Sequence, residues 1–128
     1  MILDTSAAVA LLRNEPEADL FLDTIEAADQ WGMSVVSVLE LAIVTRASGP
    51  DLVDDFLDDM GIRSLGVDAE QLRWARHAFG LYGRGSDSPA RLNFGDCFSY
   101  AAAKATGRAL LFKGDDFTHT DVRRAVPG

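Results

Sequence analysis

The stretch from Leu92 to Lys104 constrains the fold most, because it predicts a buried helix with an acid in its first turn. Asn93 is a good N-cap residue, which places Asp96 at the third helical position. One face of this helix carries apolar residues near helical spacing, namely Cys97, Phe98, Ala101 and Ala105. Gly107 then stops the helix. Such a helix needs an apolar partner surface, and we expect it to lie against a β-sheet.

Length and composition predict one globular domain over residues 1–128. The chain is 48% hydrophobic and 25% charged, which is enough for a substantial core. Its first residues lack a basic signal region, and it has no run of roughly eighteen apolar residues. We therefore expect a soluble, cytoplasmic protein with no membrane span. The single cysteine, Cys97, cannot form an internal disulfide and is interpreted as a small core side chain.

The net charge of −8 hides an asymmetry along the chain. Residues 1–70 carry fifteen acids and three arginines, a balance of −12, whereas residues 71–128 carry nine bases and five acids, a balance of +4. The average field would repel a nucleic acid, but the bases could gather into a local phosphate-binding face. An ordinary solvated surface is the alternative. The nine bases are Arg73, Arg76, Arg84, Arg91, Lys104, Arg108, Lys113, Arg123 and Arg124.

Short apolar segments alternate with helical segments along the chain. Strands are expected at 1–3, 33–36, 62–67 and 109–112, with a short edge strand near Val122. Helices are expected at 7–12 after a Thr5 or Ser6 cap, and at 16–28, 37–48, 51–60, 69–82 and 94–106. In the helix that Asp68 caps, the apolar stripe is Leu72, Ala75, Phe79 and Tyr82. The crossovers are too long for hairpins, so we predict an α/β fold with a mainly parallel sheet of four to five strands.

Several acids follow the predicted strands. Asp4 follows the first strand, Glu40 follows the second by one helical turn, and Asp115 and Asp116 follow the last. Ligands of parallel sheets bind beyond the carboxyl ends of the strands, so these acids should converge there. Asp96 joins them if the N-terminus of its helix points the same way.

Two of these acids also have purely structural interpretations. Ser37-x-x-Glu40 matches a capping box, in which Glu40 reaches back to its own N-cap residue. Asp96 could complete a capping box with Asn93 and complement the helix dipole, a contribution of about 0.3–1 kcal/mol. Taken singly, either acid is explained by capping.

A cluster of carboxylates restricts the chemistry of the edge at which it lies. Two carboxylates about 4 Å apart repel by roughly 4 kcal/mol at an effective dielectric constant of about 20. Converging acids must therefore bind a cation or take up protons. Oxygen ligands without histidine or cysteine suit Mg²⁺ and also Mn²⁺. Because such ions activate water and stabilise charge on phosphate, phosphodiester hydrolysis is the expected reaction.

Four motifs together resemble a known family. They are Asp4-Thr5-Ser6-Ala7, Ser37-x-x-Glu40-Leu41, Leu92-Asn93-Phe94-Gly95-Asp96-Cys97 with Tyr100-Ala101, and Gly114-Asp115-Asp116-Phe117. Their order and sequence resemble PIN-domain ribonucleases, and more narrowly the VapC toxins of type II (VapBC) toxin–antitoxin pairs, over essentially the whole chain. The resemblance implies a three-layer PIN fold and a Mg²⁺-dependent endoribonuclease. It also implies a homodimer that a cognate VapB-like antitoxin neutralises.

The resemblance also assigns roles to residues. Asp4, Glu40 and Asp96 match metal-binding acids of the family, and either Asp115 or Asp116 matches the fourth acid, with Asp116 preferred as the metal ligand. All five are candidate catalytic residues. Thr5 and Ser6 match hydroxyl positions that hydrogen-bond the acids or the substrate.

Three bases are candidate RNA-binding residues: Arg84 and Arg91, in the loop before the helix that carries Asp96, and Lys113, after the last strand. An antitoxin tail bearing arginine or lysine is expected to reach the acids and displace the metal.

Alternative functions differ in what they require of the sequence. A phosphorelay receiver could use Asp4 and Lys113, but it needs a second acid at the position of Thr5. It also needs a phosphoacceptor after the third strand, where Asp68 is better explained as an N-cap. A non-catalytic PIN-like RNA-binding module would not need acids at all the matching positions. A flap-type DNA nuclease shares the chemistry but needs elements for which this chain has little room.

Overall fold

A computed structural model of the chain describes residues 1–126, so residues 127–128 of the predicted domain lie outside the described residues. Over 1–126 the sheet has four strands, β1 (Ile2–Leu3), β2 (Gly32–Ser34), β3 (Arg63–Leu65) and β4 (Leu110–Leu111). Their order is β3-β2-β1-β4, and all neighbours are parallel. The predicted α/β fold with a parallel sheet of four to five strands is confirmed.

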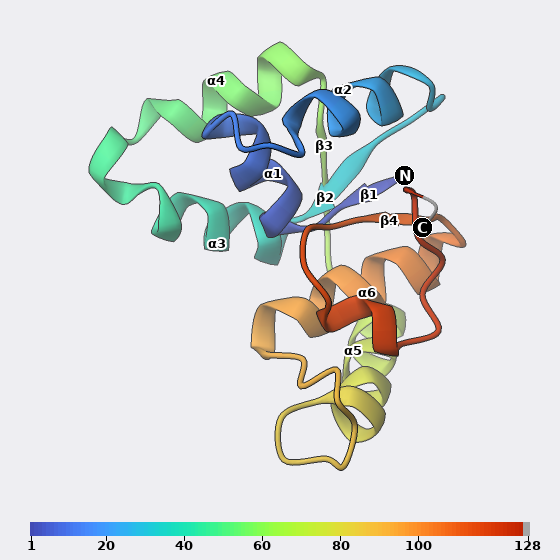
Figure 1. Ribbon diagram of the computed structural model, residues 1–128. Coiled ribbons are helices and arrows are strands. Elements are labelled where there is room, and N and C mark those ends of the chain that lie inside the picture. The colour runs from blue at the N-terminus through green and yellow to red at the C-terminus, as the bar shows by residue number, and fades with distance from the viewer. Residues whose placement is uncertain (127–128) are drawn as a thin grey trace.

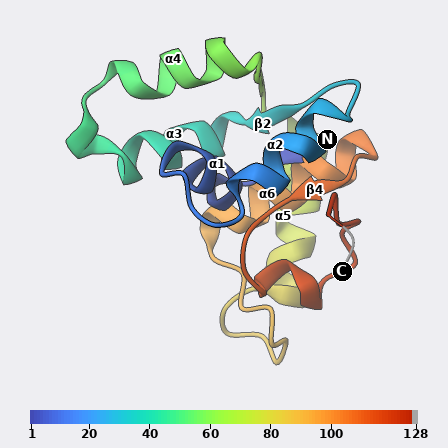
Figure 2. The ribbon, with the colours of Figure 1, turned by 45° about the horizontal axis from the view of Figure 1, so that its top comes forward.

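Helices cover both faces of this sheet (Figure 1). One side carries α1 (Thr5–Leu12), α2 (Ala18–Glu26), α3 (Val35–Val44) and α4 (Asp51–Met60), while α5 (Ala69–Tyr82) and α6 (Phe94–Thr106) lie on the other. In Figure 2, α1 and α2 lie in front of the sheet and α6 lies behind it. Two 3-10 turns, η1 (Arg46–Ser48) and η2 (Asp116–His119), complete these elements. No helix within residues 1–126 is both long and apolar enough to cross a bilayer.

The two central strands divide the core between these layers. Ile2 and Leu110 pack with α5 and α6, whereas Leu3 and Leu111 pack with α1 to α4. All four side chains are buried, because successive residues of a strand point to opposite faces and both faces are covered. The strands can therefore be short and still hold two layers together.

The helix that carries Asp96 follows the sequence prediction closely. The Asn93 side chain accepts a hydrogen bond from the Asp96 backbone N–H at 2.9 Å, and the Asp96 carboxylate accepts one from the Asn93 N–H at 3.0 Å. This reciprocal pair is a capping box. Gly107 ends the helix in the left-handed region with φ of 68°.

The predicted caps of α1 and α3 are wrong. Ser34, rather than Ser37, caps α3 and accepts a hydrogen bond from the Val36 N–H, so Ser37 and Glu40 do not form a capping box. The chain turns into the helix directly after β2, although valines such as Val36 favour a strand locally. Similarly, the side chain of Asp4 caps α1, which neither Thr5 nor Ser6 does.

Three predicted segments differ in extent. The strand expected at 33–36 ends earlier, as β2. The strands expected at 62–67 and 109–112 both begin later and end earlier, as β3 and β4. Near Val122 the backbone makes a single bridge, between Leu110 and Arg124, instead of an edge strand.

The apolar stripe predicted on α5 is only partly covered by other residues. Ala75 is buried, but Leu72 is 48% exposed and Phe79 is 63% exposed.

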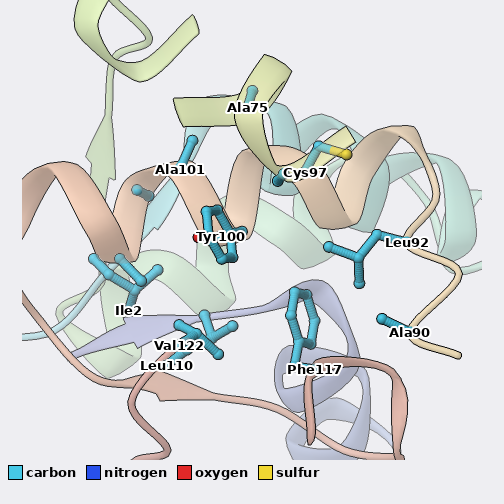
Figure 3. Packing of buried hydrophobic residues seen from close by; sticks show 13 residues of the cluster. Ile2, Ala75, Ala90, Leu92, Cys97, Tyr100, Ala101, Leu110, Phe117 and Val122 are labelled. Carbon is cyan, nitrogen blue, oxygen red and sulfur yellow. The ribbon is translucent and has the colours of Figure 1, made fainter. Parts of the chain in front are cut away.

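Tyr100 connects α6 to the segment that follows η2. Its ring is fully buried and lies among Ile2, Leu92 and Phe117 in the core (Figure 3). Its hydroxyl donates to Asp121 Oδ1 at 2.7 Å, and Lys104 Nζ lies 2.9 Å from Asp121 Oδ2. Burial, followed by the hydrogen bond to Asp121, raises the pKa of Tyr100.

Tyr100→Phe should lower the free energy of unfolding by about 1–2 kcal/mol, because the ring packing stays and the hydrogen bond to the Asp121 carboxylate is lost. Chemical denaturation measures this difference. The matched control is Tyr82→Phe, since the Tyr82 ring is half-buried and neighbours Tyr100. An equal loss in both variants would contradict the assigned role of the Tyr100 hydroxyl.

Candidate active site

The acids singled out by sequence converge at one end of the sheet. Asp4 lies directly after β1, and Glu40 lies on α3, which begins directly after β2. The first turn of α6, with Asp96, lies at this same end, as do the carboxyl ends of β1 and β4 (Figure 1). The condition that placed Asp96 with the other acids is therefore met, because its helix begins at the carboxyl ends of the strands.

Asp4 is the most enclosed of these acids and is 4% exposed. Its Oδ2 accepts hydrogen bonds from the backbone N–H of Ser6 at 3.0 Å and from the Ser6 hydroxyl at 2.6 Å. Its Oδ1 accepts a hydrogen bond from the Ser99 hydroxyl at 2.6 Å. Both carboxylate oxygens are thus held by short bonds, and the orientation of the carboxylate is fixed.

Asp96, 9% exposed, has a strongly shifted pKa. The pKa of Asp96 is raised to about 7: burial is the main cause, the hydrogen bond from the Asn93 backbone opposes it, and the negative charges of Asp4, Asp116 and Glu40 add smaller contributions. The capping interpretation is therefore correct but incomplete, because the Asp96 carboxylate is also buried near three other acids.

Glu40 approaches the first turn of α6 at Gly95. A Cβ atom at Gly95 would overlap the carboxylate of Glu40, so glycine lets this acid lie against α6 in its present position. Glu40 is half-buried and lies in the second turn of α3, where it contributes nothing to the N-cap. The site, rather than helix capping, accounts for its position.

The fourth acid comes from the turn after β4. Asp115 precedes η2 and Asp116 begins it, and both side chains are exposed. Asp116 contributes to the raised pKa of Asp96, whereas Asp115 is not among its causes. This difference supports Asp116 as the acid that faces the other three.

The candidate hydroxyl and basic residues lie in different settings. Ser6 contacts Asp4, but the Thr5 hydroxyl is buried and donates to the Ser37 carbonyl at 3.3 Å. Lys113 Nζ pairs with Glu15 at 3.2 Å and with Glu17 at 3.0 Å, and hydrogen bonds to Glu17 and then Glu15 raise the pKa of Lys113.

The bases of residues 71–128 do not gather into one face. Arg84 and Arg91 are exposed around the loop between α5 and α6. Arg108 and Arg123 instead line a pocket beside Met1, at the amino end of β1, and Lys104 pairs with Asp121. Near the acids, Arg76 and Arg84 line an apolar groove of about 390 Å³ between α5 and α6, which extends to Asn93 and Phe94.

Sequence reasoning missed three residues of this site. Ser99 and Ser37 are fully buried beside Asp4, and their hydroxyl oxygens lie 3.0 Å apart. Ser99 lies one helical turn after Asp96, so its spacing was a usable signal. Ser37 was assigned to a helix cap instead. Gly95 was missed because its contact is with Glu40, which lies on another helix.

The donor chemistry of the site fits a hard divalent cation. The acids offer carboxylate oxygens without histidine or cysteine, and such oxygens are the ligands that Mg²⁺ and Mn²⁺ prefer. Within residues 1–126, no three acidic, histidine or cysteine side chains lie close enough together to hold a metal ion by themselves. Mg²⁺ and Mn²⁺ typically bind through one or two carboxylates and keep several waters.

A parallel α/β domain with candidate acids at the carboxyl end of its sheet is the fold and site that comparisons with known proteins can place in a family. A family model described as PIN domain matches residues 1–123, and the chain therefore belongs to the PIN-domain family. Its curated relatives are VapC ribonucleases. The chain is 50% identical to ribonuclease VapC42 and 44% identical to ribonuclease VapC30, both of Mycobacterium tuberculosis. These alignments cover 98% and 95%, respectively, of both chains.

Solved structures share this fold at low sequence identity. A toxin–antitoxin complex from Klebsiella pneumoniae matches with a TM-score of 0.72 and 14% identity, covering 94% of this chain and 92% of the other. Mycobacterium tuberculosis VapC20, described as a sarcin-ricin loop cleaving toxin, matches with a TM-score of 0.69 and 17% identity, covering 95% and 98%. The family resemblance and the PIN fold are thereby confirmed, and the phosphorelay alternative gains no support.

In a chelating buffer the melting temperature should rise as the pH falls from about 8 to about 6. The folded protein, in which the pKa of Asp96 is about 7, takes up a proton there, whereas the unfolded chain, with the ordinary value of 3.8, does not. Thermal unfolding of Asp96→Asn should show a flatter pH dependence. Asp115→Asn is the control and should keep the parental slope, so equal slopes in all three proteins would contradict the raised pKa.

Proposed function

We propose that this protein is the divalent-metal-dependent endoribonuclease toxin of a toxin–antitoxin pair. The single observation that carries the proposal is the placement of Asp4, Glu40, Asp96 and Asp116 at the carboxyl end of one parallel sheet, with the Glu40 carboxylate against the first turn of α6, where a cation would offset their charges. The curated relatives support the same reaction, because they are named ribonucleases and align with this chain over nearly their full length. The cytoplasm is the compartment we propose for it.

Asp4, Glu40, Asp96 and Asp116 are the residues that would hold the cation, Mg²⁺ or Mn²⁺. When bound, such an ion supplies an activated water nucleophile and stabilises charge on the phosphate and the leaving oxygen. Asp4 acts as the fixed anion, since both of its oxygens are held by hydroxyl groups. Asp96 would be held as the ionised carboxylate once the cation is bound, and Glu40 orients groups from the α3 side of the site.

The substrate we propose is RNA. Its backbone would approach along the loop between α5 and α6, where Arg84 and Arg91 are exposed. Lys113 contributes less to phosphate binding than Arg84, because Glu15 and Glu17 neutralise its charge. Thr5 supports the site through the Ser37 carbonyl rather than by contact with substrate.

The direct experiment incubates the purified protein with total RNA, with Mg²⁺ or with a chelator, and maps the new RNA ends. Discrete ends that require the metal support the proposal. The absence of cleavage under both conditions would favour a non-catalytic RNA-binding module.

Asp116→Asn should lower the rate of RNA cleavage at least about tenfold, because it removes a charged group from the cation site. The neighbouring Asp115→Asn is a matched control with the same change of charge and should cut near the parental rate. Initial rates at saturating Mg²⁺ measure both. The reverse order of the two rates would make Asp115 the fourth acid.

The proposed antitoxin would inhibit by placing an arginine or lysine against the carboxylates. The carboxylates of Asp4, Glu40 and Asp96 would accept charge-assisted hydrogen bonds from such a side chain, which would take the place of the metal ion. Occupation of the site by the antitoxin and by metal would then be mutually exclusive. The structural neighbour described as a toxin–antitoxin complex is consistent with a partner of this kind.

We also propose a homodimer, and its support is an exposed apolar stripe on α3. Val35, Leu39 and Ile43 recur every fourth residue and are exposed, with Leu39 at 63% and Ile43 at 65%. A contiguous stripe of this kind on one helix face is typical of an interface.

Ile43→Asp should convert the proposed dimer to a monomer, because a charge would be buried at the centre of the contact. Light scattering coupled to gel filtration measures the mass. Leu20→Asp on α2 is the control, since Leu20 is also about half exposed, at 51%, and this variant should stay dimeric. A monomeric parental protein would contradict the proposal outright.

A further inference from the structure

We propose that Ser99 and Ser37 are positioning residues that form a hydroxyl relay behind Asp4 and set the cation affinity of the site. The inference rests on the proposed function for the identity of the ligand, a divalent cation. It concerns Ser99, which lies outside the motifs of the sequence, and Ser37, which the motif Ser37-x-x-Glu40 assigned to a helix cap. Neither side chain is an acid.

The relay is built from three elements that are distant in the sequence. Ser99 on α6 donates to Asp4 Oδ1 at 2.6 Å, and Ser37 on α3 lies 3.0 Å from Ser99 between the hydroxyl oxygens. Both serines are fully buried. A hydroxyl group in such a place must find partners within the protein, and here the partners are the other serine and the acid.

The direction of the hydrogen bonds follows from the chemistry of the groups. An ionised carboxylate only accepts, so the single proton of Ser99 points to Asp4. The oxygen of Ser99 is then left to accept, and Ser37 must donate to it. Each bond polarises the next, so the proton of Ser37 strengthens the bond that Ser99 makes to Asp4.

A second relay holds the other oxygen of the same carboxylate. The Ser6 hydroxyl donates to Asp4 Oδ2 at 2.6 Å and accepts from the backbone N–H of Lys113 at 3.0 Å. Asp4 is therefore gripped from α6 on one oxygen and from the end of β4, through Ser6, on the other. Neither oxygen can rotate without breaking a charge-assisted bond, and the remaining lone pairs keep one orientation.

This arrangement predicts how the two serines should behave when they are changed. Loss of Ser99 removes one of the two sets of restraints on the Asp4 carboxylate, and supporting groups of this kind typically change metal affinity about 10- to 100-fold. Ser37 does not touch Asp4, so its influence has to pass through Ser99. Its removal should matter when Ser99 is present and should have no effect when Ser99 is absent.

The test is a double-mutant cycle with Mn²⁺ as the titrant and without RNA. Calorimetry on the full chain should show about tenfold weaker Mn²⁺ binding for Ser99→Ala, a smaller loss for Ser37→Ala, and no further loss in the double variant. Ser99→Cys keeps the side-chain volume with a weaker donor and should lie between the parent and Ser99→Ala. Thermal unfolding confirms that each variant is folded.

The matched control is Thr45→Val, which removes a buried hydroxyl at the end of α3 that bonds only to the Leu41 carbonyl. It should bind Mn²⁺ as the parent does. Parental affinity in Ser99→Ala, additive losses in the cycle, or an equal loss in Thr45→Val would overturn the relay. Mn²⁺ binding that follows the cycle without RNA cleavage would support the relay and overturn the proposed nuclease function, whereas a parent that does not bind Mn²⁺ would overturn both.

Discussion

The buried carboxylate of Asp4 is the group on which the rest of the site depends. It ends β1, caps α1, and receives hydroxyl groups from Ser6 and from Ser99 on α6. An ion of this kind is costly to bury unless its oxygens are satisfied, and here the hydrogen bonds that satisfy them also join the two helical layers. The stability of the fold and the geometry of the pocket thus depend on the same few bonds.

The parallel sheet explains why the acids meet at one place. β1, β2 and β4 point the same way, so the segments that follow them deliver Asp4, Glu40 and Asp116 to one edge. Asp96 approaches from the opposite layer on the first turn of α6. Burial, together with the charges of the other three acids, raises the pKa of Asp96, and perturbed pKa values of this kind cluster at functional sites.

Close approach of backbone to side chain completes the pocket. Gly95 lets the carboxylate of Glu40 lie against α6, and a larger residue there would displace this carboxylate. Asp116 is exposed to solvent, so the site can be reached from this side. A rigid inner carboxylate and a more open outer one are the arrangement expected of a site that holds a hydrated ion against a phosphate.

The sequence by itself determined the class of fold, the capping box and end of α6, and which acids are candidates for the site. These follow from local patterns: helical periodicity, cap chemistry at Asn93 and Gly107, and acids placed after strands. Only the tertiary structure decided the contacts of Glu40, Gly95, Ser37 and Ser99. Each depends on a contact between helices far apart in the chain, and a local pattern such as Ser37-x-x-Glu40 matched a cap that the chain does not form, because the turn at Ser34 starts the helix earlier.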